Sequence, residues 1–131
     1  LTRIAMFNSI KTSLENKQIV SELTSKLALG TENVIARIAL GYSLANHDKL
    51  DLGKIEDSKG KEYSSKVLFG DNQAIYIALI CQKYGIYKEN REMSKYLKLH
   101  MDLGLKNIYS DMKDNPNKDG TEILLSYIAI G

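Results

Sequence analysis

The stretch from Glu15 to Ala45 constrains the fold most, because two helical hydrophobic patterns follow each other across a glycine. The first pattern repeats apolar residues at spacings of one, three and four, which is the stripe of an amphipathic helix. Its members are Ile19, Val20, Leu23 and Leu27. Gly30 follows, and glycine readily adopts the left-handed conformation that ends many helices. The sequence therefore predicts two consecutive helices joined by a tight turn.

The predicted starts of both helices carry residues that cap helices. Thr12 and Glu15 match the T-x-x-E capping box, in which each side chain bonds an amide that the first turn leaves unpaired. Thr31 is positioned to cap the second helix. That helix has an apolar face too broad for one partner helix, which predicts burial in a core or in a dimer. The face consists of Val34, Ile35, Ala36, Ile38, Ala39, Leu40, Tyr42 and Leu44.

Residues 3–11 are rich in strand-compatible side chains, and residues 1–14 contain no acid. We expect a short strand or extended arm here. A short basic strand followed by two helices is the order of ribbon-helix-helix modules. A chain of 131 residues suffices for one core. The sequence thus predicts a single, mainly α domain over 1–131, with a ribbon-helix-helix-like part at about 3–45 and further packed helices at about 46–131.

The later part of the chain predicts two long helices after an irregular segment, residues 46–70. Asp71 can cap a helix that stops at Gly85 and is apolar nearly all round, so we expect it to be the central buried helix. A further helix is predicted over about 92–113. Its Gly104 costs about 1 kcal/mol relative to alanine, which predicts that another backbone packs closely against it.

Side chains that support catalysis or hold metals are few. A zinc site needs several histidine or cysteine ligands, and the chain has only His47, His100 and Cys81. We therefore expect no metal and no cofactor. The phosphate-binding pattern GxxxxGK followed by Ser or Thr is absent. We expect Cys81 to pack in the core and His100 to be half-buried with satisfied hydrogen bonds.

The formal charge of +2 is modest, but the cations fall into two zones. The N-terminal zone combines Arg3, Lys11 and Lys17 with the predicted helix N-terminus. Amides after Thr12 would be free there, and a helix N-terminus is a natural phosphate site. We therefore expect DNA phosphates to bind in this zone, with a solvated cationic surface as the alternative.

The second zone places Arg91, Lys95 and Lys98 at spacings that a helix brings to one edge. Cations at such spacings can track a phosphate backbone. Interleaved tyrosines could stack on unpaired bases; they are Tyr84, Tyr87 and Tyr96. The alternative is a solvated outer face whose tyrosines pack inward.

Three longer segments carry a resemblance to a known family: RIALGYSLA in the second helix, GKEYSSKVLFGD, and IYIALICQKYGI. Over roughly residues 3–115 the chain resembles the DndE family of DNA sulfur-modification proteins. The resemblance implies a part in DNA phosphorothioation, in which sulfur replaces a non-bridging phosphate oxygen. It further implies a non-catalytic subunit that binds double-stranded DNA, prefers nicked duplex and assembles as a tetramer. The partners it implies are a cysteine desulfurase, an iron–sulfur protein and an ATPase.

Other functions stay open beside this leading one. A ribbon-helix-helix transcriptional regulator would read an operator through paired strands, although residues 3–11 lack strict alternation. A cryptic nicking nuclease would use Asp51, Asp57 and Lys59, which imitate a metal-nuclease pattern at too short a spacing. A pure assembly scaffold would leave its lysines in solvent. No apolar run is long enough to span a membrane and no secretory leader is visible, so we expect a cytoplasmic protein. The broad apolar face of the second helix and the apolar C-terminal tail should not be coverable within one subunit, so we expect a homo-oligomer, with a tetramer as the expected state.

Overall fold

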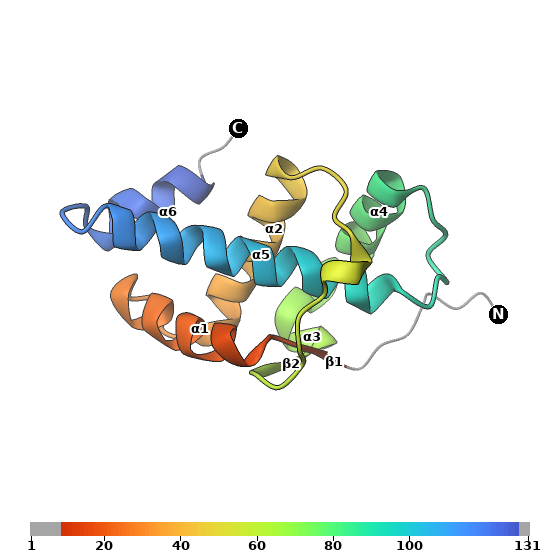
Figure 1. The fold of residues 1–131 in the computed structure, drawn as a ribbon, viewed down its shortest axis with the longest axis horizontal. Helices are drawn as coiled ribbons and strands as arrows, with labels where there is room; N and C mark the ends of the chain where they lie inside the picture. The colour runs from red at the N-terminus through yellow and green to blue at the C-terminus, as the bar shows by residue number, and fades with distance from the viewer. Residues whose placement is uncertain (1–8, 129–131) are drawn as a thin grey trace.

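The computed structural model describes residues 9–128, and that range is mainly helical, as predicted. The helices pack around one hydrophobic core beside a two-stranded sheet (Figure 1). The α-helices are α1 Leu14–Lys26, α2 Glu32–Asn46, α3 Ser65–Phe69, α4 Gln73–Tyr84, α5 Met93–Asp114 and α6 Gly120–Ile128. The short elements are β1 Ser9–Lys11, β2 Glu62–Ser64 and the 3-10 turns η1 Leu52–Lys54 and η2 Gly70–Asn72. No helix within the described range is long and apolar enough to cross a membrane.

The strand predicted within residues 3–11 is present from Ser9, and the residues before it lie outside the described range. β1 pairs antiparallel with β2, with Ile10 opposite Tyr63. Both side chains are buried, so the pair is anchored to the core. The order of strand, helix and helix is therefore that of a ribbon-helix-helix module. Here, however, β1 pairs with β2 of the same chain rather than with a strand of a second subunit.

The central helix is α5, which runs the length of the molecule between α1 and α2 (Figure 1). Ten of its residues are buried. The prediction that α4 is central is wrong, because its buried side chains are limited to Ile77 and Ile80. Ile75 and Leu79, on the opposite side of α4, remain 58% and 41% exposed. Because α4 is apolar on nearly every side, its sequence could not reveal that only one side packs against other helices of the chain.

Gly104 of α5 lies directly against the backbone of α2, as its position in the sequence predicts. A Cβ atom at this position would stand 2.1 Å from the carbonyl oxygen of Ala39. That separation is far inside van der Waals contact, so only glycine lets the two helices approach this closely. The crossing places Ala36, Ala39 and Leu40 of α2 out of solvent.

The apolar face of α2 is covered within the chain, contrary to the expectation that one subunit could not bury it. α5 covers most of it, and α1, α3 and α6 contact the rest. Val34 and Ile38, at its margins, are only partly buried. The sequence pattern correctly indicated burial, but it could not show how many helices of the same chain gather on one face.

The helix boundaries correct several capping assignments. α1 is capped by Ser13, whose Oγ accepts from the amide of Asn16, whereas Thr12 bonds the neighbouring loop. α1 also ends at Lys26, one turn before Gly30. Thr31 does occupy the N-cap position of α2, but its side chain makes no capping hydrogen bond. α4 begins after η2, so Asp71 is not its cap.

His100 is fully buried rather than half-buried, and both its ring nitrogens have partners. Nδ1 lies 2.8 Å from Ser43 Oγ, and Nε2 lies 2.7 Å from the Tyr84 hydroxyl. That hydroxyl accepts from the amide of Leu50, which ties the loop after α2 to α4 and α5. Burial, together with the nearby Lys83 and His47, lowers the pKa of His100 to about 4, so the ring is neutral at pH 7.

Candidate nucleic-acid interface

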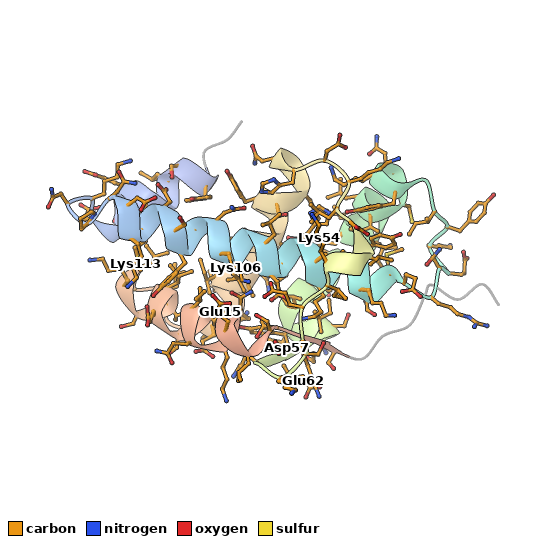
Figure 2. The ribbon with its side chains drawn as sticks, viewed as in Figure 1. Glu15, Lys54, Asp57, Glu62, Lys106 and Lys113 are labelled. Atoms are coloured by element: carbon orange, nitrogen blue, oxygen red, sulfur yellow. The ribbon has the colours of Figure 1, made fainter. Side chains whose placement is uncertain are left out.

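The N-terminus of α1 was predicted to bind phosphate, but the protein's own carboxylates occupy its amides. The Ser13 amide donates to Asp102 Oδ1 at 3.2 Å, and the Leu14 amide donates to Asp57 Oδ1 at 2.9 Å. Asp57 lies in the loop below α1 in Figure 2 and also accepts from the amide of Lys59. These two backbone hydrogen bonds hold the pKa of the Asp57 carboxyl below its usual range. With the amides of Ser13, Leu14 and Asn16 already bonded, this helix N-terminus offers DNA fewer amides than the sequence predicted.

Lys98 is buried and paired, so the prediction that it shares an outer edge with Arg91 and Lys95 is wrong. Its Nζ donates to Asp102 Oδ2 at 2.7 Å and to the carbonyl of Lys11 at 2.8 Å. Asp102 also accepts from Asn16 Nδ2 at 2.7 Å. The spacing argument failed because α5 begins only at Met93, which leaves Arg91 outside the helix. Lys98 lies in the same helix as Lys95, but it is only 5% exposed because Asp102 and the Lys11 carbonyl cover its ammonium.

A surface groove brings the two predicted basic zones together. Its volume is about 370 Å³, and it lies where β1 and the first turn of α5 adjoin the loop before β2. Lys11 and Lys95 both line it, although they are far apart in the sequence. Three serine hydroxyls join them, from Ser9, Ser58 and Ser94. Lysines and hydroxyls are the side chains that most often contact DNA phosphates, so we call this hollow the β1–α5 groove.

Two lysines of the β1–α5 groove, Lys11 and Lys95, are held only by weak ion pairs, whereas the third, Lys98, belongs to the buried pair with Asp102. Lys11 Nζ lies 3.9 Å from a carboxylate oxygen of Glu62, and Lys95 Nζ lies 3.1 Å from one of Glu92. All four side chains are 40–56% exposed, and such solvent-exposed pairs contribute about 0–1 kcal/mol. Both lysines can therefore exchange a carboxylate for a phosphate at little cost. Glu56, the acidic side chain that lines the groove, is already paired with Lys106.

The other predicted cations lie apart from this groove. Lys17 is exposed on the outer side of α1 and lines a separate hollow with Lys61. Arg91 is exposed in the loop before α5. Arg3 falls outside the described residues. The sequence analysis did not identify Lys61 as a neighbour of Lys17. The one local indication was the adjacent Gly60, whose backbone packs against Ser13 at the start of α1.

The three predicted tyrosines separate into two groups. Tyr84 and Tyr96 stack on each other with ring centroids 4.1 Å apart and pack against the core. Tyr87, in the loop between α4 and α5, is 85% exposed. No hydrogen bond or ring contact involves its side chain within residues 9–128. The predicted inward packing therefore applies to Tyr84 and Tyr96, whereas Tyr87 is the exposed ring of the three.

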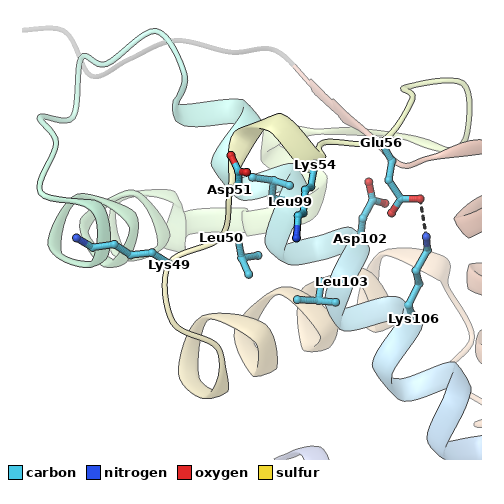
Figure 3. Close-up of a pocket in the computed structure, with 9 residues that line it drawn as sticks. All are labelled: Lys49, Leu50, Asp51, Lys54, Glu56, Leu99, Asp102, Leu103 and Lys106. Carbon is cyan, nitrogen blue, oxygen red and sulfur yellow. Dashed lines mark hydrogen bonds and ion pairs between the residues drawn. The ribbon is translucent and has the colours of Figure 1, made fainter.

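The residues of the nuclease hypothesis do not form one site. Asp51 lines a cavity of about 610 Å³ between η1 and α5, with an apolar side formed by Leu50, Leu99 and Leu103 (Figure 3). Its Oδ1 accepts from the Gly53 amide and so caps η1. Asp57 instead accepts from the Leu14 amide at the start of α1. Among the described residues, no group of three or more histidine, cysteine or acidic side chains is placed to hold a metal ion.

The fold and the groove define a small, mainly helical protein with a cationic hollow between a strand and the start of its central helix. Residues 9–115 match the sequence model of a family described as DNA sulphur modification protein DndE. The chain belongs to the DndE family, which confirms the resemblance. No curated protein matches the sequence.

Two solved structures share the fold. A crystal structure of DndE from Escherichia coli B7A, described as involved in DNA phosphorothioation modification, aligns with a TM-score of 0.62 at 17% identity. The alignment covers 77% of this chain and 96% of that one. A DndE G21/24K mutant involved in DNA phosphorothioation aligns with a TM-score of 0.64 at 14% identity, covering 78% and 97%. These likenesses extend over nearly the whole of the solved chains.

Proposed function

We propose that the protein is a non-catalytic DNA-binding subunit of the DNA phosphorothioation machinery. The observation that carries this proposal is the β1–α5 groove, where Lys11 and Lys95 meet in a member of the DndE family. Both cations are exposed, and their ion pairs are weak enough to be displaced by phosphates. Arg91 and Lys17, which are exposed but lie apart from the groove, remain proposed phosphate contacts. Lys98 is no longer among the proposed contacts, since its charge is neutralised in the core.

The subunit would hold DNA while partner proteins carry out the sulfur chemistry. Its proposed partners are a cysteine desulfurase, an iron–sulfur protein and an ATPase, and its proposed location is the cytoplasm. A preference for nicked duplex belongs to the same proposal. The carboxylates of the competing nuclease hypothesis already accept backbone hydrogen bonds, Asp57 from the Leu14 amide at the start of α1 and Asp51 from the Gly53 amide of η1. This use supports a binding role over a hydrolytic one.

The ribbon-helix-helix regulator is the less favoured alternative. Such a regulator inserts strands from two subunits, paired with each other, into the major groove. Here β1 pairs with β2, and Ile10 and Tyr63 hold the pair against the core. Reading an operator in that way would require β1 to leave this partner.

We also propose that the protein is a homo-oligomer, with a tetramer as the expected state. The surface that supports self-association is the outer face of α4, since α2 is covered within the chain. Ala74, Ile75, Ala78 and Leu79 follow the helical repeat on this face and are all exposed. Val67 of α3 is also exposed, at 52%. Isolated exposed apolar residues are ordinary, but a continuous apolar stripe on a helix is typical of an interaction surface.

A binding titration across a salt series tests the DNA-binding proposal. The test variant is Lys11→Gln/Lys95→Gln, and the matched control is Lys26→Gln/Lys118→Gln, which removes the same charge from exposed positions at the other end of the molecule. If the groove lysines contact two phosphates, the slope of log K against log salt falls by about 1.8 in magnitude. The control should keep the parent slope.

Intact, nicked and single-stranded DNA of matched length are titrated side by side. The parent should bind nicked duplex most tightly, and binding should weaken steeply with salt for every sequence. If the parent binds none of the three DNAs at low salt, the DNA-binding proposal is wrong and the scaffold hypothesis gains support. If the groove and control variants lose affinity equally, the cations act only through net charge and the groove is not the contact.

A further inference from the structure

The loop between α4 and α5, residues 85–92, holds an aromatic side chain in solvent on a well-braced backbone. Gly85, with a φ of +64°, ends α4 in the left-handed conformation, and its amide donates to the Cys81 carbonyl at 2.9 Å. The Asn90 amide donates to the Tyr87 carbonyl at 3.0 Å and closes a turn. Asn90 Oδ1 then accepts from the Glu92 amide at 2.7 Å. The backbone that carries Tyr87 is thus fixed at both ends.

The ring of Tyr87 is open on both faces. Its neighbours Tyr84 and Tyr96 fill the space beneath the loop by stacking on each other, so Tyr87 has no place in that cluster. The side chain is 85% exposed, the largest exposure among the large apolar and aromatic residues of the described range. An aromatic ring presented in this way loses little conformational entropy when it stacks on a planar partner.

Cations flank the ring. Lys88 and Arg91 belong to the same loop, are exposed, and form no ion pair within residues 9–128. Glu89 and Glu92 bring the formal charge of residues 85–92 to zero, but Glu92 is paired with Lys95, so Glu89 is the acid left beside the two cations. Arg91 precedes α5 by two residues, and Lys95 lies in the first turn of that helix. The loop therefore continues from the α5 side of the β1–α5 groove.

We propose that Tyr87 stacks on an unpaired nucleobase of DNA, while Lys88 and Arg91 hold the phosphates on either side of it. An aromatic ring beside cations is the arrangement that binds single strands independently of sequence, because every base presents a π face. This inference rests on the proposed DNA-binding function and names the feature of DNA that the loop recognises. A paired base, stacked on both sides within a duplex, offers no face to the ring, so the loop distinguishes gapped or frayed DNA from intact duplex.

The test compares intact duplex with a duplex that carries a short single-stranded gap. Tyr87→Ala should lower affinity for gapped DNA by roughly 5- to 150-fold, the range for losing one base–aromatic stack. It should leave affinity for intact duplex unchanged. Tyr87→Phe should retain gapped-DNA binding, because stacking needs the ring and not the hydroxyl. Tyr87→Leu, which is apolar without a π face, should behave like Tyr87→Ala.

A fluorescent variant reads out the contact itself. The chain contains no tryptophan, so Tyr87→Trp introduces a single indole at the loop. Gapped or single-stranded DNA should quench its emission, and intact duplex at equal occupancy should not. The matched control is Tyr109→Trp, since Tyr109 lies half-buried on α5, away from the loop. Its emission should respond equally to both DNAs.

The outcomes separate this inference from the proposed function. If the parent binds intact and gapped DNA but Tyr87→Ala binds both as tightly as the parent, the stacking proposal is wrong and DNA binding stands. Indole emission that changes on dilution of the protein but not on addition of DNA would assign the ring to a protein contact, and would also overturn it. If the parent binds no DNA at all, both proposals fail together.

Discussion

Lys98 Nζ and Asp102 Oδ2 lie 2.7 Å apart, one turn from each other on α5, in an almost solvent-free environment. Beyond their ion pair, both side chains also form hydrogen bonds to the segment that joins β1 to α1. Lys98 donates to the Lys11 carbonyl, and Asp102 accepts from the Ser13 amide and from Asn16. The two side chains thereby fix the junction that bears Lys11 against the helix that bears Lys95. The pair thus joins the two segments that carry the groove lysines Lys11 and Lys95.

Removing one member of the pair should destabilise the protein strongly. Asp102→Ala leaves a buried ammonium without its counter-charge and strands the Ser13 amide, so we expect a loss of about 3–5 kcal/mol in the free energy of unfolding. Lys95→Ala, on an exposed position of the same helix, should change it by less than about 0.5 kcal/mol. Urea denaturation measures both.

The pairing itself is tested by a double-mutant cycle. Lys98→Met/Asp102→Leu replaces both charges with apolar groups. This double variant should lose less stability than the two single variants together, because it leaves no unpaired charge in the buried site. Additive single effects would mean that Lys98 and Asp102 act independently, contrary to the geometry.

Gly104 offers a second test, with an unusually well-matched control. Gly104→Ala places a methyl group where the Ala39 carbonyl already stands, so the helices must separate, and we expect a loss of at least about 1–3 kcal/mol. Gly41→Ala adds the same methyl group to α2, where nothing lies within 4 Å. That change should stabilise the protein by up to about 1 kcal/mol through helix propensity. Thermal melts that shift equally for both variants would refute the close α2–α5 contact.

Short-range patterns predicted the helices well and their surroundings less well. The apolar spacing in α1, α2 and α5 located these elements, and Gly104 correctly indicated a close backbone contact, because both signals are local. The central helix was misassigned because burial depends on which elements approach, and α4 is apolar on sides that no helix of the chain covers. Lys98 was misassigned for a related reason. Its spacing from Lys95 is helical, but its partner Asp102 and the Lys11 carbonyl meet it only in the folded chain.

The candidate site was predicted in parts but not as a whole. Lys11 and Lys95 were identified from local charge, yet nothing in the sequence indicates that they line one groove. That proximity depends on how β1 is fixed against the start of α5, through contacts between residues far apart in the sequence. The same limitation applied to α1, where a free helix N-terminus was expected and Asp57, a loop residue, fills it.

Acid should destabilise the protein through His100 before its carboxylates titrate. The pKa of this ring falls from 6.5 to about 4 on folding, chiefly because burial disfavours the charged form. As the pH drops, the unfolded chain therefore takes up the proton first. Stability is fully present above about pH 6.5 and is lost progressively toward pH 4, by on the order of 2–3 kcal/mol. In His100→Gln the slope of unfolding free energy against pH over this window should be correspondingly smaller, whatever its absolute stability. An unchanged slope would assign the titration to other groups.

Asp57 should stabilise the fold of the protein and should not take part in DNA cleavage. Asp57→Ala removes the carboxylate that accepts from Leu14 at the start of α1, so we expect a lower melting temperature. Asp51→Ala, which uncaps only the short η1, should have a smaller effect. We expect no nicking of supercoiled plasmid by the parent or either variant with magnesium or manganese. Reproducible nicking that disappears in Asp57→Ala would instead support the nuclease hypothesis.

Self-association should depend on the outer face of α4. Ile75→Glu/Leu79→Glu places two charges on a stripe where residues 72–82 carry none, so an assembly that buries this face should dissociate. Each subunit should stay folded, because both side chains are exposed in the monomer. Leu125→Glu on α6 is the control, since it charges an equally exposed apolar residue on another helix. Light scattering should give the parent and the control the mass of an oligomer and the α4 variant a lower mass. A parent that is monomeric at micromolar concentration would defeat the oligomer proposal, whereas an oligomeric α4 variant would move the interface to another surface.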